Sequence, residues 1–374
     1  MKVLHVITGL AAGGAEQQLR ALLPHLNARC EVAVLTNPGV VADAIKAGGV
    51  PVHHLGMRGN RDLSVIGKLA RLMRKGDFQV VHTHLYRACV YGRLAARLAG
   101  VPAIVATEHS IGLTRIEGRR ITAPVRVLYL ASELLGHSTV AVSRSVAERL
   151  GQWGVPRSRI EVIANGIDGA AFKYDPVRRK RMRACLGLPE EAFVVGGVGR
   201  LERGKRFDLL LDVMADIESV HALIVGAGTE QHALQELARR LGVADRVVFA
   251  GESPNVAGLL SAMDVLVAPS QEETFGLAVL EGLAAGLPVL YTTCPAVDDL
   301  PAFAAPGALR IPYGRDRLRL ELRALAATGT ERLPPPPAVE HYDIRRQAGQ
   351  FDALYRRLLG ATTDRKYVKK EGFR

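Results

Sequence analysis

Residues 269–281 bring together the groups of this 374-residue sequence that point most directly to chemistry. The segment follows an apolar run predicted as a strand and enters a predicted helix near Gly276. Backbone amides in the first turn of a helix have no acceptor within the helix. The amides of Phe275, Gly276 and Leu277 therefore predict an anion-binding site.

Two carboxylates accompany these amides, Glu273 in the predicted loop and Glu281 in the predicted helix. A bound diphosphate would repel a carboxylate that pointed at it. We therefore expect both carboxylates to accept hydrogen bonds from neutral hydroxyls of the same ligand, for which sugar and ribose hydroxyls are the obvious candidates.

Two further glycine-containing loops are candidates for binding a diphosphate. Gly199 and Arg200 stand at the end of a predicted strand, where ligands of open α/β sheets bind, and Lys205 follows one short loop later. Two cations next to glycines could neutralise a diphosphate without a metal, although a solvated turn explains them equally well. The loop 9–16 contains Gly14 before a predicted helix, but its spacing is not the GxGxxG of dinucleotide sites.

The elements that must position these residues form two series. Short runs rich in Val, Ile, Leu and Ala alternate with amphipathic stretches, which is typical of parallel sheets covered by helices on both faces. The series restarts after residue 168, so we predict an α/β protein with two Rossmann-like sheets. The runs are 3–7, 31–36, 50–55, 80–84, 103–107, 139–142 and 161–164, then 193–198, 222–225, 247–250, 265–268 and 289–292.

Length and composition favour a folded enzyme of two domains. At about 150 residues per domain the length suggests two, and 48% hydrophobic residues exclude intrinsic disorder. No apolar run reaches the roughly 18 residues of a membrane-spanning helix, and the first residues lack a signal-peptide pattern. The four cysteines have no paired spacing, which argues against a zinc site or a disulfide framework. We expect a cytoplasmic protein.

The net charge of +12 favours an anionic partner without saying which. Nucleic acid is disfavoured because the basic residues are not interleaved with aromatic ones. The basic run within residues 172–188 is interpreted as a solvated helix face in preference to a binding patch. Residues 111–124 mix Arg115, Arg119 and Arg120 with Ile and Leu. They are expected to face an acceptor or an anionic membrane surface, with a solvated connection between helices as the alternative.

Three histidines end predicted strands. His109 follows one strand, and His82 and His84 end another, where we expect them on alternate faces. A histidine in such a place is more often a hydrogen-bonded structural group than a catalyst. We predict no metal site at these histidines, because no carboxylate or cysteine completes one in sequence.

The spacing of Glu273 and Glu281 resembles the E-x7-E motif of retaining glycosyltransferases of family 4, which have the GT-B fold. The likeness extends over nearly the whole chain, to the predicted helix that ends near residue 359. The other segments that resemble this family, in the same order, are 13–16, 81–84, 105–109, 165–168 and 199–201 with Lys205.

This resemblance implies an arrangement for the whole chain. Residues 1–168 would form an acceptor-binding Rossmann-like domain that faces, across a cleft, a nucleotide-sugar-binding domain of residues 169–340. A helix at residues 341–360 would cross back to pack on the first domain, and residues 361–374 would form a basic tail.

The resemblance also implies roles for single residues. Arg200 and Lys205 would bind the diphosphate, Glu273 the hydroxyls of the donor sugar, and Glu281 the ribose. His109 would lie near the reacting sugar, which makes Glu273, His109, Arg200 and Lys205 the expected catalytic group. The remaining residues expected at the donor are Gly14, Gly199, Phe249, Gly251, Phe275, Gly276 and Leu277, with the base near residues 248–252.

The function implied is a retaining glycosyltransferase of the hexosyltransferase type, with a nucleotide-sugar donor, UDP-linked in preference to GDP-linked. No metal or other cofactor is expected, since no D-x-D motif is present. The acceptor would be a hydroxyl of a glycan, of a lipid-linked molecule or of a small molecule. Such an enzyme would serve polysaccharide biosynthesis in the cytoplasm, with peripheral contact at the inner face of the membrane as a further expectation.

The alternative function is a nucleotide-sugar 2-epimerase, because these isomerases share the architecture of two Rossmann-like domains. The E-x7-E spacing together with Arg200 and Lys205 favours transfer. Residues 293–299 depart from the Gly-Gly-x-x-Glu turn of many relatives, so the sugar itself is not predicted.

Overall fold

The computed structural model describes residues 1–11, 13–117 and 119–371, with the backbone alone for residue 119 and residues 362–371. The chain forms two units. Unit 1 is Met1–Gly166 together with the segment that starts at Ile344, and unit 2 is Ile167–Asp343. From the sequence these boundaries are expected after residues 168 and 340.

Unit 1 is built on a sheet of seven parallel strands in the order β3-β2-β1-β4-β5-β8-β9. Helices α1, α2 and α15 pack on one face and α3 and α4 on the other, so the central strands are buried on both sides. That burial is why they are continuous apolar runs in the sequence. The elements are β1 (Lys2–Ile7), α1 (Gly14–Leu22), β2 (Arg29–Val34), α2 (Gly39–Ala47), β3 (Val52–His54), α3 (Ser64–Gly76), β4 (Val80–His84), α4 (Tyr86–Ala99), β5 (Ala103–Glu108), β6 (Arg115–Ile116), β7 (Arg119–Arg120), α5 (Ala123–Glu133), β8 (Ser138–Ala141), α6 (Arg144–Trp153), β9 (Ile160–Val162) and α15 (Ile344–Glu371).

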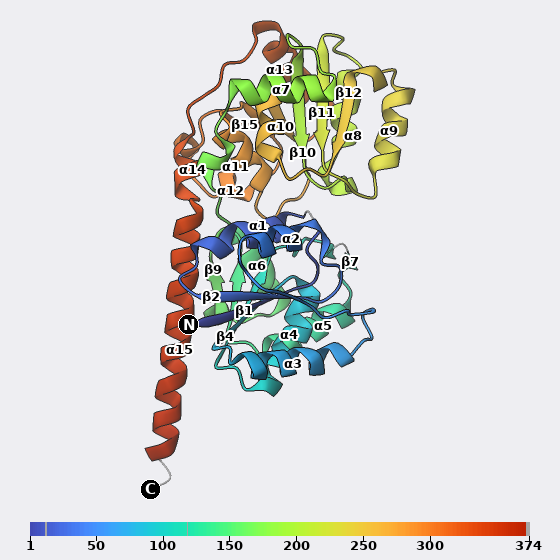
Figure 1. Cartoon of the computed structure of the whole chain (residues 1–374). Coiled ribbons are helices and arrows are strands. Elements are labelled where there is room, and N and C mark those ends of the chain that lie inside the picture. The colour runs from blue at the N-terminus through green and yellow to red at the C-terminus, as the bar shows by residue number, and fades with distance from the viewer. Residues whose placement is uncertain (12, 118, 372–374) are drawn as a thin grey trace. The chain divides into compact units, whose positions relative to one another are not determined.

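The last helix, α15, belongs to unit 1 and runs along it (Figure 1). It contacts α1 and β5. Its apolar face buries Phe351, Leu354 and Tyr355 against the sheet. The helix continues to Glu371, beyond its predicted end at residue 360. The predicted basic tail of residues 361–374 is therefore helical as far as the structure describes it. In the described ranges, no helix has both the length and the apolar composition needed to cross a bilayer.

Unit 2 has a parallel sheet of six strands in the order β12-β11-β10-β13-β14-β15. Two parallel Rossmann-like sheets confirm the predicted fold class. The edge strand β15 was not predicted, because it has three residues, two of them exposed, and so forms no apolar run. The elements are α7 (Pro176–Leu186), β10 (Phe193–Val198), α8 (Phe207–Met214), β11 (Val220–Val225), α9 (Gln231–Arg240), β12 (Val247–Gly251), α10 (Val256–Ala262), β13 (Val265–Ala268), α11 (Leu277–Ala284), β14 (Val289–Tyr291), α12 (Pro295–Asp298), β15 (Ala308–Arg310), α13 (Arg315–Thr328) and α14 (Pro337–His341).

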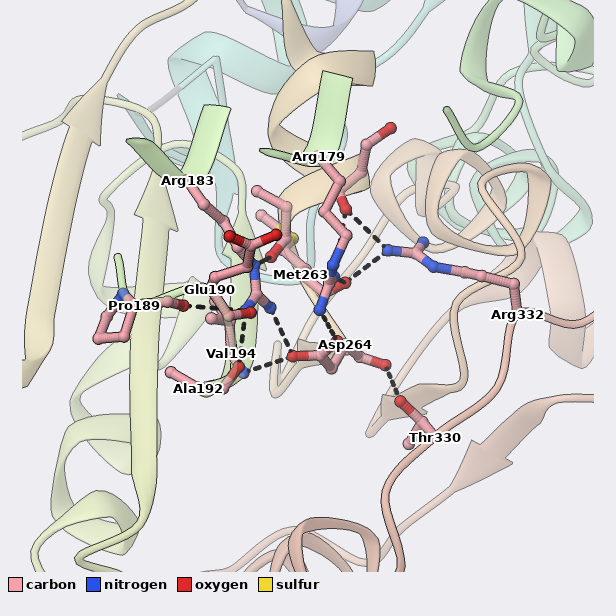
Figure 2. A network of polar contacts seen from close by, with 12 residues as sticks. Arg179, Arg183, Pro189, Glu190, Ala192, Val194, Met263, Asp264, Thr330 and Arg332 are labelled. Carbon is pink, nitrogen blue, oxygen red and sulfur yellow. Dashed lines mark hydrogen bonds and ion pairs between the residues drawn. The ribbon is translucent and has the colours of Figure 1, made fainter. Parts of the chain in front are cut away.

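Part of the basic run on α7 is neither a solvated face nor a binding patch. Figure 2 shows Arg179 and Arg183 pointing toward Asp264, which precedes β13; their guanidinium groups lie 2.7 and 2.8 Å from its carboxylate oxygens. Arg183 is 1% exposed and also donates to the carbonyl of Ala192 at 2.8 Å. Arg332 donates to the carbonyl of Met263 in the same network. Arg179 and Arg183 hold α7 onto the amino ends of β10 and β13, which corrects the interpretation of the basic run as a solvated face.

The basic loop of residues 111–124 contains a small hairpin of β6 and β7. Its apolar residues are not all on the surface, because Ile111 and Ile116 are fully buried. Leu113 is 71% exposed, and Arg115 and Arg120 are exposed with it. The surface expected from the sequence is therefore more basic and less apolar than the amino-acid types suggest.

Candidate nucleotide-sugar site

The strand order of unit 2 reverses between β10 and β13. In open α/β sheets, the loops that leave the carboxyl ends of two such strands diverge, and ligands bind between them. Arg200 and Lys205 follow β10, while Glu273 and Gly276 follow β13. The structure thus brings the two predicted phosphate-binding segments to the same edge of one sheet.

Lys205 and Glu273 form an ion pair between these two loops, from Nζ to Oε1. Their side chains are 24% and 15% exposed. The loops are also joined through the backbone, where the amide of Gln271 donates to the carbonyl of Gly204 at 3.2 Å. The Lys205 ammonium offsets the charge of Glu273, and this makes it possible for a carboxylate to lie beside a bound anion.

The start of α11 depends on a glycine. Gly276 has φ = 101°, which other residues rarely adopt, and a Cβ on it would lie 2.4 Å from Sγ of Cys294. The backbone amides of Phe275, Gly276 and Leu277 have no acceptor in the described part of the chain. Three unused amides next to Lys205 make this turn suitable for binding phosphate oxygens.

Glu281 lies half-buried on α11. Burial raises the pKa of its carboxyl to about 7, and no charge or hydrogen bond from the described residues offsets that desolvation. A desolvated carboxyl without a partner is suited to accept hydrogen bonds from ligand hydroxyls.

Glycines hold the loops after β10, β11 and β12 close together. The amide of Gly199 donates to the carbonyl of Val225 at 3.0 Å, and the amide of Gly226 donates to the carbonyl of Gly251 at 2.8 Å. A Cβ on Gly226 would lie 2.0 Å from the carbonyl oxygen of Gly199. The sequence pattern does not place Gly226 among the expected site residues, but the structure shows that only glycine fits there. In the sequence, Gly226 could have been found because it directly follows β11, the strand next to β10.

Two other predicted donor residues have different environments. Arg200 is exposed, and its side chain has no hydrogen bond or ion pair with any residue that the structure describes. Phe249 is half-buried on β12, and its ring packs against the hydrophobic core of unit 2. Arg200 is therefore available to a ligand, whereas Phe249 contributes mainly to the core.

Gly14 and His109 belong to unit 1, and the other predicted site residues belong to unit 2. Gly14 is the exposed first residue of α1. His109 follows β5 and is half-buried, and burial lowers the pKa of its imidazole to about 4. Its Nε2 lies 3.2 Å from Nδ1 of His84.

His5 is a residue of this neighbourhood that the sequence pattern does not single out. Its Nδ1 lies 3.1 Å from Nε2 of His84, and its side chain is fully buried on β1. In the sequence, His5 could have been noticed only as a histidine within an apolar strand, at a position that faces the interior. Its partners become visible only once β1 and β4 are known to be neighbours. His82 and His84 are two residues apart on β4, so they share a face and do not alternate as expected from the sequence.

Known protein families match both halves of the chain. Residues 12–170 match the family described as Glycosyltransferase Family 4, and residues 178–323 match the family described as Glycosyl transferases group 1. The chain belongs to this family of glycosyltransferases.

Curated family 4 relatives are similar over part or most of their length. The D-inositol 3-phosphate glycosyltransferase 1 of Catenulispora acidiphila is 31% identical over 271 residues, which are 65% of this chain and 64% of that protein. The 2-deoxystreptamine glucosyltransferase of Streptomyces kanamyceticus is 26% identical over 79% of this chain and 82% of that protein. The chain spans less than two thirds of the D-inositol 3-phosphate glycosyltransferases that it matches.

Solved structures of other glycosyltransferases share the fold. HepE of Anabaena, in complex with UDP and glucose, superposes with a TM-score of 0.83 at 22% identity, over 95% of this chain and 99% of that one. Sucrose-phosphate synthase of Thermosynechococcus elongatus gives a TM-score of 0.77 at 19% identity, over 96% and 100% of the two chains. At this identity the likeness supports the GT-B fold and nothing finer.

Proposed function

We propose that this family 4 member transfers a sugar, with retention and without a metal, from a nucleotide-sugar donor to an acceptor hydroxyl. The observation that carries the proposal is the place in unit 2 where the strand order reverses, between β10 and β13. Lys205 and the unused amides at the start of α11 are suited to a diphosphate, Glu273 beside them to the hydroxyls of a sugar, and the desolvated Glu281 to those of a ribose. A UDP-sugar is the favoured donor, in keeping with the UDP complex of HepE.

Charge develops on the leaving diphosphate as the bond to the sugar breaks. Lys205, Arg200 and the amides of α11 would stabilise that charge in a partly desolvated place. Because these groups supply the positive charge, the proposed mechanism needs no metal. The acceptor hydroxyl would attack from the face that the diphosphate leaves, and a phosphate oxygen would take its proton. Glu273 would orient the donor sugar and would not become a nucleophile.

The proposed acceptor is a hydroxyl of a glycan, a lipid-linked molecule or a small molecule. Two of the relatives are named for D-inositol 3-phosphate and for 2-deoxystreptamine, both rings that carry several hydroxyls. A polyhydroxylated ring is therefore the first acceptor class to test with this chain.

Replacing Glu273 by alanine tests the site. Turnover with a UDP-sugar and an acceptor is expected to fall about 100-fold or more, since the sugar loses the group that orients it. Affinity for UDP should stay equal or increase, because Lys205 is then freed from its ion pair. Initial rates and UDP titrations measure the two effects. Glu236→Ala, which removes a carboxylate paired with Arg239 on α9, is the matched control and should change neither.

Near-normal transfer by Glu273→Ala would contradict the role given to this residue. Incubation of the wild-type protein with a radiolabelled UDP-sugar and no acceptor tests the reaction class. Release of an epimerised sugar nucleotide would replace the transferase by a 2-epimerase.

A further inference from the structure

Helix α12 and the residue before it pack against the turn that starts α11. Cys294 is fully buried, and its Sγ lies 3.5 Å from the carbonyl oxygen of Phe275 and 3.8 Å from that of Gly276. The amide of Ala296 donates to the same carbonyl of Phe275 at 2.9 Å. The segment 294–296 therefore contacts the carbonyl groups of the turn whose amides would bind phosphate.

The thiol of Cys294 is a hydrogen-bond donor at neutral pH. Burial raises its pKa well above the ordinary value, so the thiol stays protonated. Its single proton has the carbonyl of Phe275 as the nearer of the two acceptors. A buried, protonated thiol is chemically inert. The role of Cys294 therefore lies in its contacts and not in nucleophilic or redox chemistry.

The geometry of the peptide bond links these carbonyls to the amides of the turn. In a trans peptide, the C=O of one residue and the N–H of the next lie in one plane and point in opposite directions. The carbonyl of Phe275 thus shares its plane with the amide of Gly276, and the carbonyl of Gly276 shares its plane with the amide of Leu277. Because Cys294 lies on the carbonyl side of both planes, both N–H groups point away from it.

The turn needs such contacts because it contains a glycine. Gly276 has φ = 101°, and without a Cβ its backbone can adopt many other conformations. Sγ of Cys294 lies only 2.4 Å from the place that a Cβ on Gly276 would take. The sulfur therefore packs directly against this glycine and restricts rotation of the peptide groups on both sides of it.

Asp298 fixes the position of Cys294. One carboxylate oxygen of Asp298 accepts from the amide of Cys294 at 3.1 Å, and the other accepts from the hydroxyl of Tyr291 at 3.1 Å. Tyr291 is the last residue of β14 and is 4% exposed. A series of contacts thus connects the sheet, through Asp298 and Cys294, to the turn.

We propose that Cys294 is a positioning residue that directs the amides of Gly276 and Leu277 toward the phosphates of the donor, and that Asp298 keeps it in place. The use of these amides on a diphosphate rests on the proposed function. A turn that is fixed in advance binds an anion more tightly, because less conformational freedom is lost on binding. The proposal gives a role to the segment 293–299, in which the chain departs from the Gly-Gly-x-x-Glu turn of many relatives.

Binding of UDP and of uridine to the full-length protein tests the proposal, because only UDP has the phosphates that the amides would contact. Cys294→Ala removes the S–H donor and the contact with Gly276. It should weaken UDP binding about ten-fold and leave uridine binding unchanged. Cys294→Ser keeps a donor at this position and should bind UDP within about three-fold of the wild type. Ligand-observed NMR titrations measure both affinities.

Cys30→Ala is the matched control, because Cys30 is also buried and its Sγ lies 3.6 Å from the carbonyl oxygen of Ala28 in unit 1. Both affinities should stay unchanged in this variant. Asp298→Ala removes the acceptor for the amide of Cys294 and tests the same series of contacts at a second residue. It should weaken UDP binding and leave uridine binding unchanged.

Equal UDP affinity in the wild type, Cys294→Ala and Asp298→Ala would overturn the proposal. A parallel loss of uridine affinity would also overturn it, because the whole site would then have changed and not the phosphate contacts alone. If Cys294→Ala does not fold, the result for Asp298→Ala decides.

Inorganic pyrophosphate separates this proposal from the proposed function. If the wild type binds pyrophosphate more tightly than Cys294→Ala does but binds no UDP, the proposed function fails and the positioning role stands. If UDP binds equally well to all variants, the positioning role fails and the proposed function stands. A wild type that binds neither ligand would overturn both.

Discussion

The two carboxylates of the proposed donor site have different surroundings. Glu273 is paired with Lys205, whereas Glu281 has only desolvation acting on it, which raises its pKa to about 7. Ligand hydroxyls that donate to Glu281 stabilise its charged form, so nucleotide binding near pH 7 should release a proton from this group. The spacing of the two glutamates was readable from the sequence, but this difference depends on what packs around each of them.

Ionisation of Glu281 should destabilise the folded protein as pH rises. Burial raises the pKa of this carboxyl from its ordinary value of 4.5 to about 7, so the folded state binds the proton more tightly than the unfolded chain does. The free energy of unfolding therefore falls between about pH 4.5 and 7, and the full cost is present above pH 7. Glu281→Gln should match the wild type at pH 4 and exceed it by about 2 kcal/mol at pH 8.

Urea unfolding at the two pH values measures this effect. Glu236→Gln, which alters an exposed carboxylate on α9, should show no such difference. Equal stability of Glu281→Gln and the wild type at pH 8 would mean that the carboxyl is not desolvated as the structure indicates.

In unit 2, the stabilising contacts of Asp264 and the proposed site lie at opposite ends of the strands. Asp264 lies at the amino end of β13, where it pairs with Arg179 and Arg183 and accepts from the amide of Val194 at 2.7 Å. The proposed site is at the carboxyl ends of the strands. The network in Figure 2 thus fixes β10 and β13 from the end opposite to the loops that would bind the donor.

Asp264→Asn should destabilise unit 2 by about 3 kcal/mol, because it leaves the buried Arg183 guanidinium without a counter-charge. Thermal and urea unfolding measure the loss. Lys180 lies on the same helix as Arg183 and forms an exposed pair with Glu190 in the loop that follows. Breaking it with Lys180→Gln should cost no more than about 0.5 kcal/mol. UDP affinity at temperatures well below unfolding should be unchanged in both variants. A stable Asp264→Asn protein would show that the network contributes little.

The elements also show which parts of the fold could be predicted. Strands such as β4 and β10 are buried on both faces, so apolar runs fixed their bounds almost to the residue. The edge strand β15 was not predicted because two of its three residues are exposed. The inward direction of Arg179 and Arg183 could not be predicted, since a helical charge pattern does not show that a carboxylate from a distant strand lies opposite.

For the whole molecule, the net charge of +12 now divides into parts with different roles. Arg179, Arg183 and Arg332 stabilise unit 2 and are not offered to a partner. Arg200 and Lys205 belong to the proposed diphosphate site. Arg115 and Arg120 of the β6–β7 hairpin are exposed, and we propose them as the surface with which unit 1 contacts an anionic membrane.

This surface should give weak and salt-sensitive binding to vesicles of anionic lipid. Arg115 and Arg120 are exposed next to Leu113, and a basic residue at an anionic surface contributes about 1 kcal/mol. A variant with both arginines changed to glutamine should therefore bind about 30-fold more weakly at low salt.

The control with Arg239→Gln and Arg240→Gln on α9 has the same net charge and should bind like the wild type. Sedimentation at about 0.05 and 0.3 M salt measures both, because screening shortens the range of the attraction. If the wild type stays in the supernatant at low salt, or if both double variants lose binding equally, the hairpin is a solvated connection and the acceptor need not be membrane-bound.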